Sequence, residues 1–530
     1  MALITSKIEC EFSGAGLGWT EITADVLSPV SIKYGIHGSS AKDRVAGAGT
    51  MSLVLNNSSL NSAKKEGYYS PGHPNARINW TIGLRLRAQF LDPATSTWYV
   101  KFIGYILSIT PDAGRYGSRR VSVVLGDWIE EAARSYISGV AAQINKRSDQ
   151  VISTLIANVT RQPYATSIGT GKDTYAYALD SSRDDARNPV LQEIARVTQS
   201  ELGYFYVKGD GTVVFEPRFA RSTLVDSTTL DNTMAGLSLQ MSRDNLLTRV
   251  QTATYPRTVD TSNQILYTLN NKSLIRVGES VTISAGYTDP NNRTARVGGT
   301  SMVTPVATTD YTANSASDGS GTNLTAFLTV SATFGGNAAT IDITNTGSQD
   351  AYITKLQLRG LGIYDYGKTI GEAENTVLAA EFGDSPVLLD MRYQNDPLVG
   401  VKGAEYLLSV YGAEEIGIWY LGTDGSSNLG QTTQLAYWVQ NTIGSVSISP
   451  QTPSLQTQIL ARDIGDRVKI IEAVTGVSKS FYIQSISLEV RAPGLPFVVW
   501  VLAPADSQIY WKLGQSGYSE LGTTTRLVYT

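Results

Sequence analysis

The sequence is poor in the residues that most often carry out chemistry. Its 530 residues include one cysteine, Cys10, and two histidines, His37 and His73. One cysteine excludes an intrachain disulfide and a cysteine-based metal cluster, and two histidines leave little material for histidine metal sites or catalytic triads. Both histidines lie in turn-rich stretches without a visible partner motif. We therefore expect no catalytic residue, no metal and no cofactor.

Charge is also scarce. Charged residues make up 17% of the chain, against about a quarter in an ordinary soluble domain, which indicates a surface largely covered by neighbours. The 43 basic and 47 acidic residues leave a net charge of −4, so the chain lacks the basic excess that wrapping a nucleic acid requires. DNA could still pass such a surface transiently without binding it.

Long apolar runs are absent as well. No segment approaches the roughly 18 consecutive apolar residues of a membrane-spanning helix, and "MALITSKIECEF" lacks the apolar run of a signal peptide. We expect synthesis in a cytoplasm and no stable membrane insertion.

Three stretches resemble catalytic motifs without meeting their requirements. "GAGLG" at residues 14–18 lacks the Lys-Ser/Thr of a nucleotide-binding loop, and "LGQSGYSELG" does not have the spacing of a Gly-x-Ser-x-Gly nucleophile. Carboxylates can hydrolyse glycosides when held across a cleft, but the acidic doublets at 130–131, 184–185 and 414–415 are adjacent residues, which point apart on a helix. The sequence therefore predicts a protein that is not an enzyme.

What the sequence does contain is β-strand alternation. In residues 77–92, "RINWTIGLRLRAQFLD", every second residue from Ile78 to Phe90 is apolar, and the intervening positions include Arg77, Arg85 and Arg87. Because successive side chains of a strand face opposite sides of the sheet, this pattern predicts one face in a dry core and one face carrying three arginines. Similar stretches occur in residues 50–57, 98–109 and 119–128.

These patterns predict a mainly β protein with a few helices, of the α+β class. Residues 1–135 should form an antiparallel β-barrel, closed or nearly closed. Residues 136–254 should contain helices, the clearest running from an Asn188 cap and Pro189 towards Gly203, and a hairpin that turns at Asp210-Gly211. That hairpin belongs either to this region or to a second barrel.

The remaining chain divides by composition. Residues 255–364 are rich in Thr, Ser, Asn, Ala and Gly and alternate at sandwich-like spacing, which predicts an inserted β-sandwich. Residues 365–505 contain a helix near 398–415 and return to strands, as expected for a second β-barrel region. Residues 506–530 form a C-terminal extension.

A series of phrases in this order carries a family resemblance. They include "SPVSIKYGIHGSSAKDRVAGAGTMSLVLNN", "GYYSPGHPNARINWTIGLRLRAQF", "FIGYILSITPDAGRYGSRRVSVVLGDWIEEAA", "LQEIARVTQSELGYFYVKGDGTVVFEPR", "DIGDRVKI" and "FVVWVLAPA". Together they resemble the tail-tip or baseplate hub proteins, a group of minor tail proteins, of long-tailed bacteriophages. The resemblance spans most of the chain, although no single phrase is a catalytic signature.

The resemblance implies a structural virion protein. Such hubs are homotrimers in which each subunit contributes two barrels related to the tail-tube fold, so that three chains form a pseudo-sixfold ring around the DNA channel. The implied partners are a distal tail or tail tube protein, a tape measure protein, and receptor-binding or fibre proteins. The implied location is the tail tip, assembled in the host cytoplasm and opening for DNA ejection.

Two other functions remain open, a distal-tail protein and a receptor-binding protein that holds a carbohydrate. Residues 255–364 contain no tryptophan, which counts against a glycan cleft there. We expect Arg77, Arg85 and Arg87 to contact another protein, the alternative being a solvated barrel exterior. In the C-terminal extension we expect Trp511, Leu513 and Leu521 to add to a neighbouring subunit, the alternative being that the extension folds back onto its own barrel.

Overall fold

The computed structural model describes most of the chain. The described residues are 3–14, 16, 18–114, 117–137, 140–179, 188–222, 225–240, 246–365, 367–412, 414–419, 434–438, 442–491 and 494–505. In this part of the chain, none of the helices has the length and apolar character needed to cross a membrane. The helices are α1 (Trp128–Arg134), α2 (Ser148–Asn158), α3 (Val190–Glu201), α4 (Thr376–Phe382), α5 (Pro397–Tyr411) and α6 (Pro453–Ala461).

The N-terminal strands form what we call the first sheet half. Its strands pair in the spatial order β1-β5-β6-β7-β4-β3, all antiparallel, and the short β2 extends β1. The predicted alternation is confirmed in β4, where Met51, Leu53 and Leu55 are buried. The bounds are β1 (Thr5–Cys10), β2 (Thr20–Glu21), β3 (Val26–Gly35), β4 (Gly47–Asn56), β5 (Arg85–Asp92), β6 (Thr97–Pro111) and β7 (Arg120–Gly126).

Later strands form the second sheet half, in the spatial order β13-β30-β31-β32-β29-β14. All of these pairs are antiparallel except β13 with β30. The bounds are β13 (Thr228–Asp231), β14 (Gly236–Gln240), β29 (Thr442–Ile448), β30 (Arg467–Glu472), β31 (Val477–Arg491) and β32 (Leu495–Pro504).

The two sheet halves are not separate barrels, because one ladder joins them. Strand β31 pairs with β30 through its first residues and with β3 through its last ones, so both halves belong to one 13-stranded sheet. In the described residues no ladder closes either half into a ring; in the first half, β1 and β3 flank a cavity of about 470 Å³ instead. The predicted β-rich ends are therefore confirmed, whereas closure into two independent barrels is not found.

Residues between the halves form a helical layer with its own core. Helices α1, α2 and α3 pack with the hairpin β11–β12, and the predicted turn at Asp210-Gly211 is confirmed. Helix α3 begins one residue later than predicted, because Pro189 rather than Asn188 is its N-cap. The strands here are β8 (Gln143–Arg147), β9 (Ala165–Ile168), β10 (Thr174–Ala178), β11 (Tyr204–Val207) and β12 (Thr212–Glu216).

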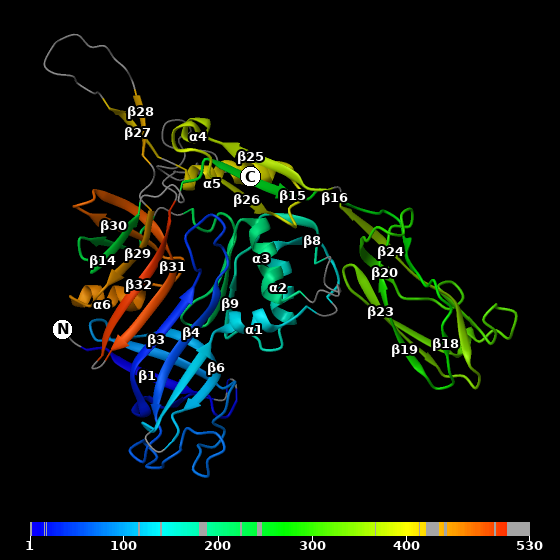
Figure 1. Cartoon of the computed structure of the whole chain (residues 1–530), viewed down its shortest axis with the longest axis horizontal. Coiled ribbons are helices and arrows are strands. Elements are labelled where there is room, and N and C mark those ends of the chain that lie inside the picture. The colour runs from blue at the N-terminus through cyan, green and yellow to red at the C-terminus, as the bar shows by residue number, and fades with distance from the viewer. Residues whose placement is uncertain are drawn as a thin grey trace, which may run out of the picture.

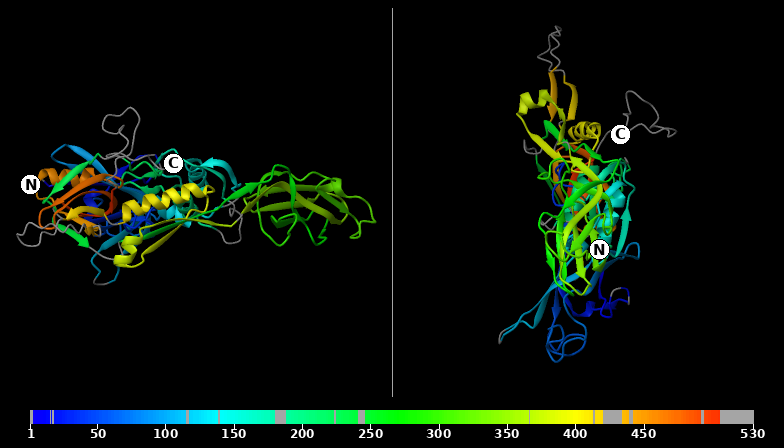
Figure 2. Two further views of the ribbon diagram at one scale, coloured as in Figure 1. Left: turned by 90° about the horizontal axis from the view of Figure 1, so that it is seen from above. Right: turned by 90° about the vertical axis from the view of Figure 1, so that its right-hand side faces the viewer.

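A long arm of two stacked sheets extends away from the body (Figures 1 and 2). Its core is separate from those of the body, and strand β24 pairs with five other strands. The arm's strands are β16 (Arg257–Val259), β17 (Gln264–Thr268), β18 (Leu274–Ile275), β19 (Ser280–Gly286), β20 (Gly298–Val303), β21 (Tyr311–Asn314), β22 (Leu328–Phe334), β23 (Ala338–Asn345) and β24 (Ala351–Asp365).

A small sheet with α5 packed against it forms the base of the arm. The sheet has the order β25-β15-β26, so the strand that enters the arm and the strand that leaves it are neighbours. Its strands are β15 (Arg249–Thr254), β25 (Thr369–Glu374) and β26 (Pro386–Asp390), and a further hairpin contains β27 (Glu414–Trp419) and β28 (Gln434–Trp438).

The alternating stretch at residues 77–92 is a strand only in its second part. Strand β5 begins at Arg85, and residues 77–84 form turns in which Asn79 and Gly83 have positive φ values of 65° and 80°. Ile78 and Ile82, predicted to face the core, are 84% and 63% exposed, while Trp80 is buried. The strand prediction was therefore wrong for this part, because the chain turns where the apolar alternation continues.

Candidate assembly surfaces

The described residues include no group of three or more His, Cys, Asp or Glu side chains placed to hold a metal. The pKa of His37 is lowered, mainly by burial and also by Lys33, and His73 accepts a hydrogen bond at Nδ1 from the backbone N–H of Asn75 at 3.1 Å. Burial raises the pKa of the Cys10 thiol to about 12, so this thiol stays protonated.

The two sheet halves have the same strand order, and their ladders match in direction except that β13 runs parallel to β30 where β1 runs antiparallel to β5. In chain order, β1, β3, β4, β5, β6 and β7 occupy the same places in the first half as β13, β14, β29, β30, β31 and β32 occupy in the second. Strands β6 and β31 both have 15 residues and both follow a turn that the preceding carboxylate caps. Asp92 accepts from the N–H of Ala94 at 3.0 Å, as Glu472 accepts from the N–H of Val474 at 2.9 Å.

Buried cross-strand rows give the correspondence residue by residue. In the first half, Ile32 of β3 begins a row that continues through Met51, Leu125 and Ile106 on β4, β7 and β6. In the second half, Leu237 of β14 begins a row that continues through Val446, Trp500 and Ile486 on β29, β32 and β31. Ile32 and Leu237 therefore occupy corresponding places, as do Ile106 and Ile486.

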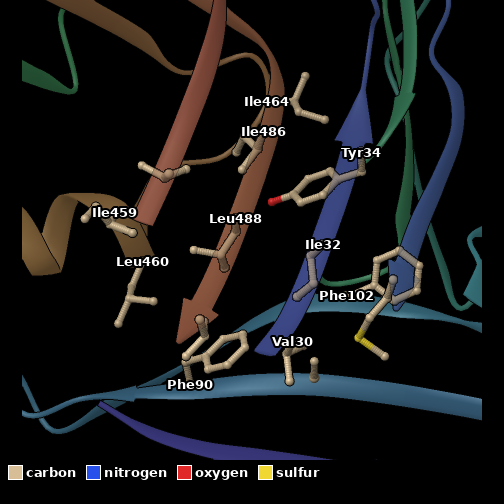
Figure 3. Close-up of a cluster of buried hydrophobic side chains, with 14 of the residues drawn as sticks. Val30, Ile32, Tyr34, Phe90, Phe102, Ile459, Leu460, Ile464, Ile486 and Leu488 are labelled. Atoms are coloured by element: carbon tan, nitrogen blue, oxygen red, sulfur yellow. The ribbon is translucent and has the colours of Figure 1, made fainter. Parts of the chain in front are cut away.

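An apolar core joins the halves (Figure 3). The ladder between β3 and β31 runs from Val30 opposite Val490 to Gly35 opposite Ser485. Ile32 and Leu488 are buried within it, and Ile459 and Leu460 of α6 lie in the same cluster as Phe90 of β5. Fully burying one such side chain contributes roughly 1.5–3 kcal/mol, so this junction is a strong, specific interface within one chain.

Polar groups fix the position of α6 at this junction. Thr457 of α6 donates from Oγ1 to Oδ2 of Asp92 at 2.7 Å, and the buried Lys101 Nζ donates to the carbonyl of Arg462 at 2.7 Å. Burial lowers the pKa of Lys101, and the nearby Asp463 opposes that shift. Burial raises the pKa of Asp463, which Lys101 opposes in turn. Lys101 and Asp463 each offset the cost of burying the other's charge. Such a pair favours one arrangement of the two halves.

The three arginines predicted as subunit contacts all have partners within the chain. Arg85 pairs with Glu11 at 3.0 Å and Arg87 with Glu9 at 2.5 Å, and both arginines are partly buried. Arg77 lies outside the strand, with its guanidinium 3.8 Å from the ring centre of Phe12.

Their contact with another subunit stays a prediction. Trp511, Leu513 and Leu521 lie outside the described residues.

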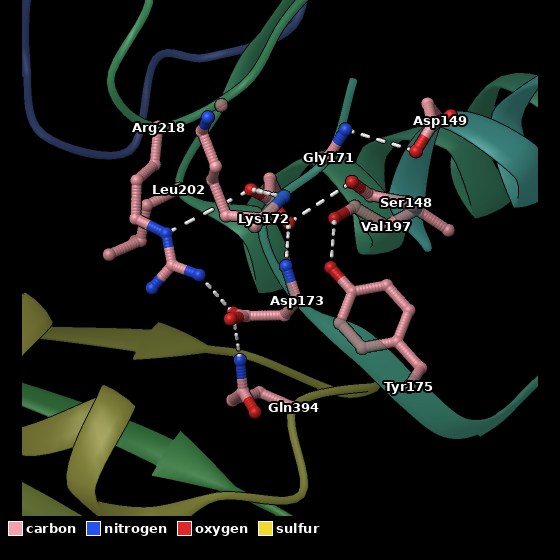
Figure 4. Close-up of polar contacts among 12 residues, drawn as sticks. Ser148, Asp149, Gly171, Lys172, Asp173, Tyr175, Val197, Leu202, Arg218 and Gln394 are labelled. Atoms are coloured by element: carbon pink, nitrogen blue, oxygen red, sulfur yellow. Dashed lines mark hydrogen bonds and ion pairs between the residues drawn. The ribbon is translucent and has the colours of Figure 1, made fainter. Parts of the chain in front are cut away.

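A buried polar cluster ties the helical layer to the base of the arm (Figure 4). Glu201, at the end of α3, accepts from Ser148 Oγ at 3.0 Å, and its carboxylate lies 3.8 Å from Nε of Arg218. Arg218 also pairs with Asp173, which accepts from Gln394 at 2.6 Å. Burial raises the pKa of Glu201, and Arg218 opposes this shift.

The sequence analysis missed this cluster, because its members come from five separate segments. Arg147 is the N-cap of α2, and the hydroxyl of Ser148, the first residue of the helix, donates to Glu201 instead.

Comparison with known proteins gives no sequence family but several structures. No protein-family model and no curated protein matches the chain. Among solved structures it is similar to the 43 kDa tail protein of prophage MuSo2 from Shewanella oneidensis, with 9% identity, coverage of 94% of this chain and 99% of that one, and a TM-score of 0.46. It matches phage tail proteins over nearly its full length.

Two further matches are also described as tail proteins. One is the tail protein from Neisseria meningitidis MC58, with 8% identity, coverage of 95% and 97%, and a TM-score of 0.44. The other is the prophage tail protein gp18 from Listeria monocytogenes EGD-e, with 8% identity, coverage of 96% of both chains, and a TM-score of 0.38.

Proposed function

We propose that this protein is a structural component of a phage tail and that it acts as the tail-tip or baseplate hub. The observation that carries the proposal is the duplication: one chain contains two sheet halves with the same strand order, joined edge to edge. We propose that these halves correspond to the two tube-like barrels expected from the family resemblance. Three such chains would present six similar units, which suits a tail tube with sixfold symmetry.

The surrounding features support the same function. The net charge of −4 suits a channel through which DNA passes without being held. The arm extends away from the paired halves, where it could reach other tail parts (Figure 2). We propose as partners the distal tail or tube protein, the tape measure protein and receptor-binding or fibre proteins, in the virion tail. No enzymatic activity is part of this proposal.

The test is the mass and shape of the purified full-length protein. We expect native mass spectrometry to give three copies, and electron microscopy to show a ring of six lobes around an opening. A ring of six copies would favour a distal-tail protein instead, and a protein that stays monomeric at every concentration would contradict the hub. Truncation after Asp506, in the same assay, tests the contact proposed for Trp511, Leu513 and Leu521; an unchanged ring would remove that contact.

A further inference from the structure

The junction inside the chain uses one edge from each half and leaves the two corresponding edges open. It joins β3 of the first half to β31 of the second. The counterpart of β3 is β14, and the counterpart of β31 is β6. Because the two halves are duplicates, the contact made by β3 and β31 within one chain can be made by β14 and β6 between two chains.

Both counterpart strands have the free edge that this contact needs. Strand β14 is the last strand of the sheet, and among the described ladders it pairs only with β29. Strand β6 pairs with β5 as far as Tyr105, and Ile106 bonds to Leu84. Beyond that point, on the side facing β5, residues 107–111 have no partner in any described ladder, whereas the matching part of β31 carries β3.

A groove lies beside β14, at the place that corresponds to the position of α6 in the internal junction. It has a volume of about 370 Å³ and lies between β14 and the β30–β31 turn, with Met234, Leu237 and Val474 in its lining. Val474 is 93% exposed. At the corresponding place in the first half, α6 packs beside the β5–β6 turn through Thr457 and Asp92.

In chain order, the first half has a loop with exposed apolar side chains in place of α6. Helix α6 lies in the connection between β29 and β30, and the corresponding connection between β4 and β5 is residues 57–84. This loop exposes Leu60, Ile78 and Ile82, at 86%, 84% and 63%. In Figure 1 it projects from the lower end of the first half (blue), while β14 and β30 lie at the far side of the second half. The two surfaces thus lie at opposite ends of the paired halves.

We propose that a second copy of this chain docks head to tail, with residues 107–111 of β6 on one chain pairing with β14 of the next. The 57–84 loop of the first chain then covers the groove beside β14, as α6 does at the internal junction. Strand addition gives partners to two open backbone edges, and the loop and groove bury exposed apolar side chains. Such a contact is heterologous, so it produces a ring when the rotation between copies closes.

This inference rests on the proposed function for self-assembly, and it adds the residues that make the contact. Cysteine cross-linking tests it, because the native Cys10 is buried. One full-length chain carries Gly236→Cys, and a second chain with a mass tag carries a cysteine at Ser108, Ile109 or Thr110. The scan over three positions allows for the bulge in the β6–β7 ladder. A chain carrying Ser31→Cys and Glu489→Cys, which lie opposite each other in the internal ladder, is the positive control.

We expect a disulfide between the tagged and untagged chains at one of the three positions, and none when both chains carry Gly236→Cys. If the control pair cross-links and the protein is a ring, but no mixed disulfide forms, the strand contact is wrong and the hub proposal stands. A cross-link between two Gly236→Cys chains would indicate a symmetric dimer and overturn the inference. A protein that stays monomeric overturns both proposals.

A second variant tests the loop independently of the cross-link. Ile82→Asp changes an exposed side chain, so the thermal stability of the monomer should not change. Assembly should need at least about tenfold more protein, because burying one large apolar side chain contributes more than the free energy of a tenfold change. Val277→Asp, at an exposed position on the arm, is the matched control and should assemble normally. If Ile82→Asp assembles like Val277→Asp, the loop is not in the contact.

Discussion

The two sheet halves share a strand order but differ in what connects their strands. In the first half, β3 and β4 are joined by residues 36–46; in the second, the corresponding strands β14 and β29 are joined by residues 241–441, which include the arm and its base. The first half also has an all-antiparallel set of ladders, whereas β13 runs parallel to β30. The cross-strand rows therefore define the repeated unit. The connections between the strands carry what is specific to each half.

The largest effect on stability should come from the polar cluster between the helical layer and the base of the arm, which neither sheet half repeats. Arg218→Ala would leave the buried carboxylate of Glu201 and the partly buried carboxylate of Asp173 without their main compensating charge. Breaking a buried ion pair in this way costs about 3–5 kcal/mol, and denaturant unfolding would measure it. The control is Arg134→Ala, whose exposed pair with Glu130 should contribute at most about 1 kcal/mol. An equal, small effect of both variants would show that the cluster does not stabilise the fold.

The difference between a covered and an open edge can be measured on β31 and β6. Leu488 is buried in the internal junction; its counterpart on β6 is Ile109, and the neighbouring Ser108 lies on the open part of that strand. Leu488→Ala should lower the free energy of unfolding by about 2–5 kcal/mol, whereas Ser108→Ala should change that of the monomer by no more than about 0.5 kcal/mol. If Ser108→Ala destabilises the monomer as strongly as Leu488→Ala, the edge of β6 is already covered within one chain.

A smaller, pH-dependent effect should distinguish the first half from the second. Asp127 follows β7 and caps α1 by accepting from the N–H of Ile129 at 3.0 Å, and burial raises its pKa to about 7. The folded protein therefore keeps a proton that the unfolded chain releases above about pH 4, so this group lowers stability as the pH rises from about 4 to 7. In the second half, α6 is capped by Thr452, which does not titrate in this range.

Asp127→Asn removes the titration and keeps a capping oxygen. The melting temperature of this variant, relative to the unchanged protein, should rise between pH 4 and pH 7 and then level off. A difference that is constant over this range would show that the carboxyl is not shifted by burial.

The smallest effect on the body should come from removing the arm. Residues 261–361 can be replaced by a short Gly-Ser linker, because Val259 and Ile363 are paired neighbours where the arm begins. We expect the melting temperature of the body to be almost unchanged. The mass of the assembly should be that of three shortened chains. Failure of the shortened chain to fold or assemble would show that the arm belongs to the scaffold.

Local signals predicted several of the regular elements. The alternation at Met51, Leu53 and Leu55 predicts β4, and the Asp210-Gly211 turn predicts the β11–β12 hairpin, since each depends only on neighbouring residues. Residues 77–84 show the limit of this approach. Their alternation is as regular as that of a strand, but the positive φ at Asn79 and Gly83 turns the chain and leaves Ile78 and Ile82 in solvent.

Non-local pairing explains what the sequence could not predict. The ladder between β3 and β31 joins residues more than 400 positions apart, and no local pattern specifies which edge meets which. For the same reason, the sequence did not predict that Glu9 and Glu11 of the same chain meet Arg87 and Arg85 of β5. The partners of these charges follow from strand order, which the sequence pattern of one strand does not contain.

The place where the chain crosses between the body and the arm also affects how the gene can change. The chain leaves the body through β15 and β16 and returns through β24 and β25, and Arg257 pairs with Asp365 where the two paths meet. Because both crossings lie side by side, an exchanged stretch of DNA coding for residues 261–361 can differ in length and sequence without shifting the register of a single strand in the body. Recombination at this point can therefore diversify the arm while selection holds the paired halves constant.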